Sequence, residues 1–224
     1  MTLKTVRILR SCDSVYYIHG DWRKVRRSLE NICGGIKFFD SPAFQRMSDA
    51  GRTALAGEKI CKELKKGNRV VYLTYGNPAL LSDGLNMLEY CKKKGYKGDI
   101  VPAPSSVDGI LALMADEREL FSNGFHVCHA EVFAGRPEVF SAHAACIALG
   151  ADNLVSGGGF SRFCDIIEAR YPGRRFIYLV RCGDGSDKDI VIRLKGGELR
   201  GAKKKITHMM SIILPGTASA GRRK

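Results

Sequence analysis

The chain has 224 residues, 45% of them apolar, and a formal net charge of +13. This length allows one large domain or two small ones, and the apolar content excludes a disordered chain. No apolar run reaches the roughly 20 residues of a membrane-spanning helix, and residues 1–10 form a basic amphipathic stretch rather than a signal peptide. We therefore expect a cytoplasmic protein without a membrane segment.

The positive charge is concentrated at the C-terminal end. Residues 200–224 carry seven Lys and Arg side chains and no acidic one, which leaves a net charge of +6 for residues 1–199. Such an end is typical of a solvated segment, but it can also bind nucleic acid or an acidic partner. A second basic cluster at residues 22–27 is expected near the loops described below.

Cysteine and histidine give no strong sign of a metal site. Eight cysteines are spread along the chain without a Cys-x-x-Cys pair. Most fall in expected helices or strands, where cysteine acts as a small apolar residue, so we expect neither disulfides nor structural zinc. One short segment contains four potential metal ligands: His126, Cys128, His129 and Glu131. On a strand these side chains would point to opposite faces, so we expect no metal there.

Helix and strand patterns alternate as far as about residue 116. Helical spacing predicts helices near residues 3–9, 49–66, 82–94 and 106–115. The third of these is expected to bury Leu81, Leu85, Leu88 and Cys91. Short apolar runs predict strands at residues 15–18, 70–74 and 99–101. This alternation is typical of a parallel sheet with helices on both faces.

The pattern changes in the second half of the chain. Strands are expected at residues 125–134, 141–149, 176–181, 189–194 and 209–214. A turn at residues 157–159 should precede a helix capped by Ser161. We therefore expect an N-terminal α/β domain at residues 1–118, a C-terminal mixed α/β domain at residues 119–215 and a basic tail at residues 216–224.

Two of the expected parallel strands end in turn residues at the same edge of the sheet. The first leads into Tyr75-Gly76-Asn77-Pro78, and the second leads through residues 101–104 to Ser105 and Ser106. Ligands of open α/β sheets bind outside the carboxyl ends of the strands, and Gly76 permits close approach to the main chain. Each loop alone is also typical of an ordinary turn, but the pair predicts a ligand cleft.

The two loops resemble those of the tetrapyrrole methylase superfamily, the class III methyltransferases that use S-adenosylmethionine. Members have a Gly-Asp-Pro loop and a Pro-Gly-x-Ser/Thr-Ser/Ala loop, which correspond here to residues 76–78 and 102–106. Residues 2–17 resemble the family's first helix and second strand. The resemblance implies a parallel Rossmann-like N-terminal domain, a mixed α/β C-terminal domain and a cofactor cleft, without the family's first strand, which carries Gly-x-Gly.

The resemblance also implies site residues. The cofactor S-adenosylmethionine would contact Tyr75, Gly76, Asn77, Pro78, Leu80, Ser105 and Ser106. The aromatic faces of Tyr16 and Tyr17 are candidates for complementing the sulfonium. Within the superfamily, the loops look nearest to the borosin-type peptide backbone N-methyltransferases. In those enzymes an arginine precedes the first loop, and Arg46 is the corresponding candidate here.

The resemblance therefore implies an S-adenosylmethionine-dependent methyltransferase that forms a homodimer and acts on a peptide amide or a small molecule. Two alternatives remain open. The absent glycine strand, together with Ala103 in place of the usual glycine, is compatible with a member that binds the cofactor without turnover. The net charge of +13 is compatible with an RNA-modifying methyltransferase.

Overall fold

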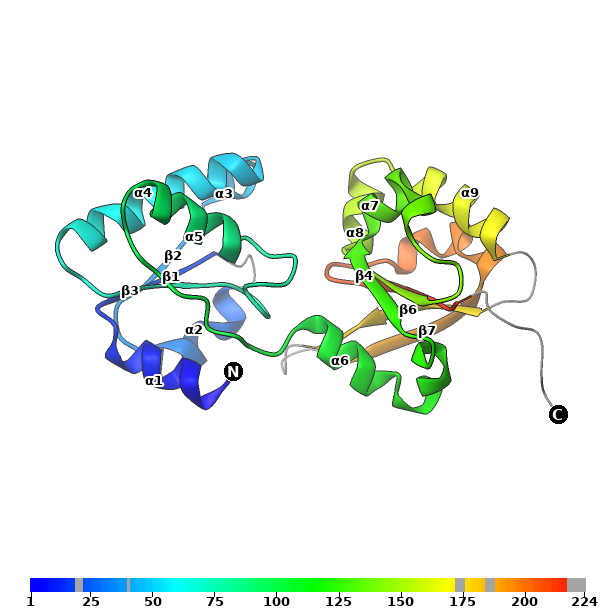
Figure 1. Cartoon of the computed structure of the whole chain (residues 1–224), viewed down its shortest axis with the longest axis horizontal. Helices are drawn as coiled ribbons and strands as arrows, with labels where there is room; N and C mark the ends of the chain where they lie inside the picture. Colours follow the sequence, from blue (N-terminus) through cyan, green and yellow to red (C-terminus); the bar gives the residue numbers. More distant parts are fainter. Residues whose placement is uncertain (19–21, 40, 172–175, 184–187, 217–224) are drawn as a thin grey trace. The chain divides into compact units, whose positions relative to one another are not determined.

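The computed structural model describes residues 1–18, 22–39, 41–171, 176–183 and 188–216. The chain divides into two compact units, Met1–Ser106 and Val107–Lys224 (Figure 1). The boundary expected at residue 118 falls in the 3₁₀ helix η1 (Ala115–Phe121) of the second unit, and independent folding of the two parts stays a prediction. Of the expected basic tail, only Gly216 lies within the described residues. None of the described helices is long and apolar enough to cross a membrane.

The first unit is built on a parallel sheet of three strands in the order β2-β1-β3. The strands are β1 (Ser14–Tyr17), β2 (Ile36–Phe38) and β3 (Val70–Leu73). Val15 in the central strand β1 lies opposite Ile36 on one side and Val71 on the other. The strands expected at 15–18 and 70–74 are therefore confirmed. The strand expected at 99–101 is wrong: these residues are irregular, because no described strand lies beside them to form a ladder.

Helices cover both faces of this sheet. They are α1 (Leu3–Ser11), α2 (Trp22–Glu30), α3 (Pro42–Gln45), α4 (Asp49–Lys65) and α5 (Gly84–Lys93). On one face, Leu9 of α1 packs in a cluster with Val15 of β1. On the other face, Ile60 of α4 and Met87 of α5 pack in a cluster with Tyr16. Figure 1 shows α1 and α2 on one side of the sheet and α4 and α5 on the other, so the unit has three layers.

Local sequence signals set the ends of α4, but the expected apolar face of α5 needs correction. The hydroxyl of Ser48 accepts a hydrogen bond from the Gly51 N–H at 3.3 Å, which caps α4 as expected. In α5 the buried residues are Gly84, Met87 and Cys91, whereas Leu81 and Leu85 are exposed. Leu81 precedes the helix, and the stripe that faces the sheet begins at Gly84 with helical spacing.

Glu63, in the last turn of α4, connects this helix to β2. Its carboxylate lies 3.2 Å from Lys66 Nζ, 3.2 Å from Lys37 Nζ and 2.7 Å from Asn68 Nδ2. The hydrogen bonds from Lys66, Lys37 and Asn68 lower the pKa of the Glu63 carboxyl from 4.5 to about 2. A carboxyl with a lowered folded-state pKa stabilises the fold at a pH above its unfolded pKa.

We therefore expect the stabilisation by Glu63 to be present at neutral pH and to be lost as the pH falls from 4.5 towards 2. Urea unfolding at several pH values between these limits should show that the free energy of unfolding of the Glu63→Gln variant depends less on pH than that of the unmodified chain. An NMR titration of the Glu63 carboxyl carbon gives the pKa directly. A midpoint near 4.5 would contradict the hydrogen bonds described above.

The second unit contains a mixed sheet of five strands in the order β4-β5-β8-β6-β7. The strands are β4 (Phe125–His129), β5 (Ala145–Leu149), β6 (Phe176–Arg181), β7 (Ile190–Lys195) and β8 (Ser211–Leu214). β4 and β5 are parallel, and the other pairs are antiparallel. The expected parallel sheet followed by a mixed sheet is thus confirmed.

The helices of the second unit are α6 (Ser106–Leu113), α7 (Ala130–Gly135), α8 (Ala151–Ser156) and α9 (Phe160–Arg170), with 3₁₀ turns η2 (Pro137–Val139), η3 (Gly196–Glu198) and η4 (Arg200–Lys205). Two expectations were wrong here. The run expected as one strand to residue 134 turns helical at Ala130, because Ala130, Phe133 and Ala134 bury one helical face. Ser161 lies inside α9, whose N-cap is Gly159.

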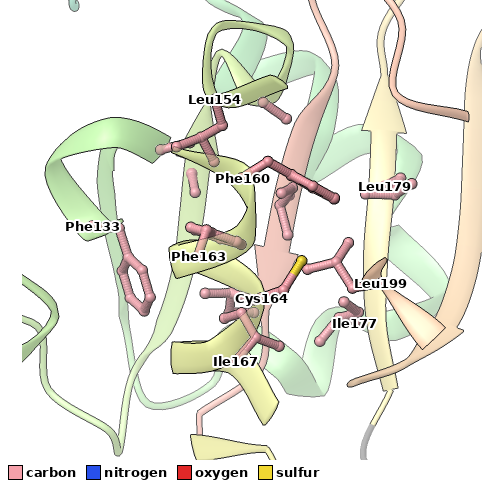
Figure 2. Packing of buried hydrophobic residues seen from close by; sticks show 14 of the residues in the cluster. Phe133, Leu154, Phe160, Phe163, Cys164, Ile167, Ile177, Leu179 and Leu199 are labelled. Carbon is pink, nitrogen blue, oxygen red and sulfur yellow. The ribbon is translucent and has the colours of Figure 1, made fainter. Parts of the chain in front are cut away.

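The core of the second unit lies between α9 and the sheet (Figure 2). Phe163 is fully buried, and the centroid of its ring lies 5.6 Å from that of Phe133 in α7. Figure 2 shows Phe160, Cys164 and Ile167 along the same helix. These side chains belong to one buried cluster with Ile177 and Leu179 of β6 and Leu199. This packing fixes the sheet against its helices.

Candidate functional site

The two loops singled out in the sequence lie together in the first unit. Gly76, three residues beyond the end of β3, has a φ of +71°, a conformation that glycine adopts without steric cost. A Cβ atom placed on Gly76 would lie 4.0 Å from both the Pro104 carbonyl oxygen and the Ser105 Cα. The structure therefore brings the Tyr75–Pro78 loop against residues 104–105. Which ligand they hold stays a prediction at this point.

The first loop is held in shape by its own hydrogen bonds. Asn77 Oδ1 accepts a hydrogen bond from the Ala79 N–H at 2.9 Å, and the Asn77 carbonyl accepts one from the Leu80 N–H at 3.1 Å. The Ser82 hydroxyl donates to the Pro78 carbonyl at 2.9 Å and accepts from the Gly84 N–H at 3.2 Å. Because the Asn77 side-chain oxygen accepts a hydrogen bond within the loop, this side chain stabilises the conformation of the loop.

Gly84, which sequence reasoning missed, fixes the position of this loop. A Cβ atom at Gly84 would lie 2.6 Å from the Pro78 carbonyl oxygen and 2.7 Å from Pro78 Cβ. Real Cβ contacts are not this short, so only glycine allows the start of α5 to pack on Pro78. No local signal identifies Gly84, since its role depends on this contact with the loop.

Thr74, also missed, places an unsatisfied polar atom beside the loops. Its Oγ1 is buried and has no hydrogen-bond partner within the described chain. Thr74 lines a cavity of about 350 Å³ together with Gly76, Pro78 and Ala103. A buried hydroxyl without a partner costs free energy, so a ligand with a polar group is a natural partner for it. The only sequence signal was its position at the end of an apolar strand.

The second loop ends at the start of α6. Ser105 and Ser106 are both half-buried. The first turn of α6 also contains Asp108, whose negative charge interacts favourably with the positive end of the helix dipole. An anionic ligand would therefore compete with Asp108 at this end of the helix. This arrangement suits hydrogen bonding from a neutral or cationic group better than binding of a phosphate.

Two of the other sequence candidates, Tyr16 and Tyr17, make aromatic contacts in the first unit. Tyr16 and Tyr17 in β1 are both 4% exposed. The Tyr16 ring stacks on Phe39 with centroids 5.5 Å apart, and the Tyr17 ring meets Phe38 edge-on at 5.9 Å. Arg46 is exposed. The contacts of the two tyrosines are those of core residues, and a catalytic role for any of the three stays a prediction.

The described cysteine and histidine side chains are distributed over several elements. Among the described residues, no three His, Cys, Asp or Glu side chains are placed to hold one ion. His126 Nε2 instead accepts a hydrogen bond from the Ser141 N–H at 3.3 Å. All eight cysteines are free thiols, and the sulfur atoms of Cys128 and Cys146 lie 3.7 Å apart in the core.

Several solved structures share this fold. A cobalt-precorrin-4 methyltransferase of cobalamin biosynthesis matches with a TM-score of 0.66 and 16% identity, over 96% of this chain and 88% of that chain. A uroporphyrin-III C-methyltransferase from Thermus thermophilus, in complex with S-adenosylhomocysteine, matches with a TM-score of 0.64 and 19% identity, over 96% of this chain and 90% of that chain. The methyltransferase CobJ matches with a TM-score of 0.71 and 15% identity, over 100% of this chain and 90% of that chain.

The sequence itself matches a family model. No curated protein matches the chain. The model of the Tetrapyrrole (Corrin/Porphyrin) Methylases, in contrast, matches residues 1–182, which include both loops and most of the second unit. The left-handed Gly76, the packed Gly84 and the unsatisfied Thr74 hydroxyl are compatible with the family's cofactor at this strand end. The chain therefore belongs to the tetrapyrrole methylases, a family of methyltransferases that use S-adenosylmethionine.

Proposed function

We propose that the chain transfers the methyl group of S-adenosylmethionine to a porphyrin- or corrin-type tetrapyrrole. The family match over residues 1–182 is the observation that carries the proposal. Two of the similar structures are enzymes named for uroporphyrin-III and cobalt-precorrin-4 as substrates. The net charge of +13 also suits the carboxylate groups around such a macrocycle, because a positive surface attracts a polyanion.

The roles of the site residues follow from their geometry. S-adenosylmethionine supplies a methyl group that its sulfonium has already activated. Gly76 leaves the main chain open to the ligand, and Pro78 and Gly84 hold that loop against α5. The Thr74 hydroxyl and the Ser105–Ser106 pair would offer hydrogen bonds to the polar groups of the cofactor. The protein thus contributes alignment of the two reactants and exclusion of water.

S-Adenosylhomocysteine is expected to raise the melting temperature of the full chain. A ligand that binds only the folded state stabilises it by about 2.7 kcal/mol at a concentration 100 times its dissociation constant. Differential scanning fluorimetry over a ligand series measures the shift, with free homocysteine as the control. A folded protein that shows no shift at millimolar ligand would refute cofactor binding.

The acceptor is tested by offering candidates together with isotopically labelled S-adenosylmethionine. The label should enter uroporphyrinogen III or a precorrin at a ring carbon. A methyl group on carbon stays attached under conditions that hydrolyse a methyl ester, so hydrolysis distinguishes the two products. The earlier expectation of a peptide amide acceptor, drawn from a nearness to borosin enzymes, has no support among the similar proteins. Label in a peptide or in RNA, with the tetrapyrroles unlabelled, would overturn the proposed substrate class.

A second candidate function is cofactor binding without turnover. Ala103 lines the cavity at a position where the resembling loop has glycine, so its methyl group occupies space beside the site. This candidate predicts a melting shift with S-adenosylhomocysteine and no label in any acceptor. Ala103→Gly separates the two functions, because a gain of transfer on this substitution would show that the alanine limits turnover.

A further inference from the structure

A second cavity of the first unit is lined almost entirely by charged side chains. Its volume is about 510 Å³, and we call it the lysine pocket. It is lined by Tyr16, Lys59, Lys62, Glu63, Lys65 and Lys66. None of these residues lines the cavity beside Thr74 or belongs to the Tyr75–Pro78 loop. The lysine pocket is therefore separate from the candidate cofactor site.

The four lysines of the pocket extend along one face of α4. Lys59, Lys62 and Lys66 follow helical spacing, so they form a row about 10 Å long, with Lys65 beside Lys62. All four side chains are exposed. Like charges at this spacing repel one another and destabilise a helix. The negative end of the helix dipole, about half an elementary charge, is too small to neutralise four ammonium groups.

Glu63 neutralises only part of this charge. Its carboxylate is shared between Lys66 Nζ and Lys37 Nζ, each at 3.2 Å, so the three groups together keep a net positive charge. Lys37 Nζ also lies 3.4 Å from the Tyr16 hydroxyl. Tyr16 lines the pocket and is only 4% exposed, so it forms the floor. The floor thus carries a hydroxyl next to a positive charge.

The other three lysines have no anionic partner in the described part of the chain. There, no carboxylate oxygen lies within 4.0 Å of the ammonium groups of Lys59, Lys62 or Lys65. Glu58, one turn before Lys62, forms no ion pair within this distance among the described residues. Lys59 Nζ lies 5.0 Å from the centroid of the Phe39 ring, an electrostatic contact that leaves its charge in place. A multiply charged anion would relieve the repulsion within this row.

We propose that the lysine pocket binds a short chain of phosphates, either inorganic tripolyphosphate or the triphosphate of a nucleotide. Lysine binds phosphate as a compact point charge, and a row about 10 Å long suits several linked phosphates better than a single one. Single-stranded nucleic acid also needs exposed aromatic rings on which bases stack, whereas Tyr16 and Phe39 are 4% and 6% exposed. The phosphate chain is therefore the part that the pocket recognises. This inference goes beyond methyl transfer and does not rest on it.

Isothermal titration calorimetry of the full chain with sodium tripolyphosphate at low salt tests the proposal. We expect saturable one-to-one binding that weakens as salt screens the lysines. The double variant Lys62→Gln/Lys65→Gln should bind at least about tenfold more weakly. Lys4→Gln/Arg7→Gln is the matched control, because it removes the same charge from exposed positions of α1 and should leave the affinity unchanged. Equal weakening by both pairs would overturn the proposal, since net charge alone would then explain binding.

Two further ligands and one structural readout complete the test. Orthophosphate should bind at least about tenfold more weakly than tripolyphosphate, and adenosine triphosphate should bind no more tightly than tripolyphosphate. Tripolyphosphate should shift the NMR amide signals of α4 and leave those of residues 75–78 unchanged. Orthophosphate binding as tightly as tripolyphosphate, or binding of an RNA oligonucleotide alone, would refute the proposal. No cofactor is present in these titrations, so their result is independent of the methyltransferase assignment.

Discussion

Replacement of Phe163 by alanine is expected to lower the free energy of unfolding of the second unit by about 3–5 kcal/mol. The Phe163 side chain is completely buried, with 0% of its surface exposed to solvent. Its ring packs beside Phe133 and within the cluster around Ile167 and Leu179. Truncation leaves a cavity that α9 cannot close without losing its contacts with the sheet.

Urea unfolding followed by far-ultraviolet circular dichroism measures this loss. Tryptophan fluorescence is unsuitable because the single tryptophan, Trp22, belongs to the first unit. Phe163→Leu should cost less, since leucine keeps part of the buried volume. Val132→Ala removes an exposed side chain and should change stability by about 0.5 kcal/mol or less. A Phe163→Ala protein as stable as the Val132→Ala protein would contradict the packing described for α9.

Replacement of Gly84 by valine is expected to weaken binding of S-adenosylhomocysteine by about 10- to 100-fold. The new Cβ would need the space 2.6 Å from the Pro78 carbonyl oxygen, so α5 and the 75–78 loop must separate. Under the proposed function the cofactor contacts this loop, so its displacement removes contacts with S-adenosylhomocysteine, and a 10- to 100-fold loss of affinity corresponds to about 1.4–2.8 kcal/mol. Isothermal titration calorimetry at one temperature and salt concentration gives the affinity.

Gly34→Val is the matched control for this substitution. It adds the same side chain in the same unit, at a glycine whose added Cβ has no neighbour within 4 Å and whose φ is not in the left-handed region. Its affinity for S-adenosylhomocysteine should equal that of the unmodified chain. If Gly84→Val binds as tightly as Gly34→Val, the contact between α5 and Pro78 does not position the cofactor loop.

Local signals were enough to predict part of this structure. Ser48 before an amphipathic run predicted the start of α4, and the turn residues at 76–78 predicted the end of β3. Signals that depend on tertiary contacts were not readable. Residues 99–101 have the composition of a strand but no ladder partner among the described residues. The helix α7 was hidden because no glycine or proline separates it from β4 in residues 125–134.

The same distinction applies to the site. Gly76 and Ser105 could be singled out because each follows an apolar run and belongs to a turn or a helix start; the structure brings them together, and their binding of the cofactor stays a prediction. Thr74 and Gly84 were not, because a hydroxyl without a partner and a glycine under a carbonyl are defined only by their neighbours in space. The aromatic candidates Tyr16 and Tyr17 illustrate the reverse: their residue type suggested chemistry, and the structure places them in the core.

Each unit contains a buried cysteine, so chemical labelling can measure the opening of each unit separately. Cys33 is buried in the first unit, and Cys164 is buried in the second. Burial raises the pKa of both thiols, so neither is reactive while its unit stays closed. An alkylating reagent added for a short pulse therefore marks Cys33 only when the first unit opens and Cys164 only when the second does. The ratio of the two labels reports which half of the chain opens first.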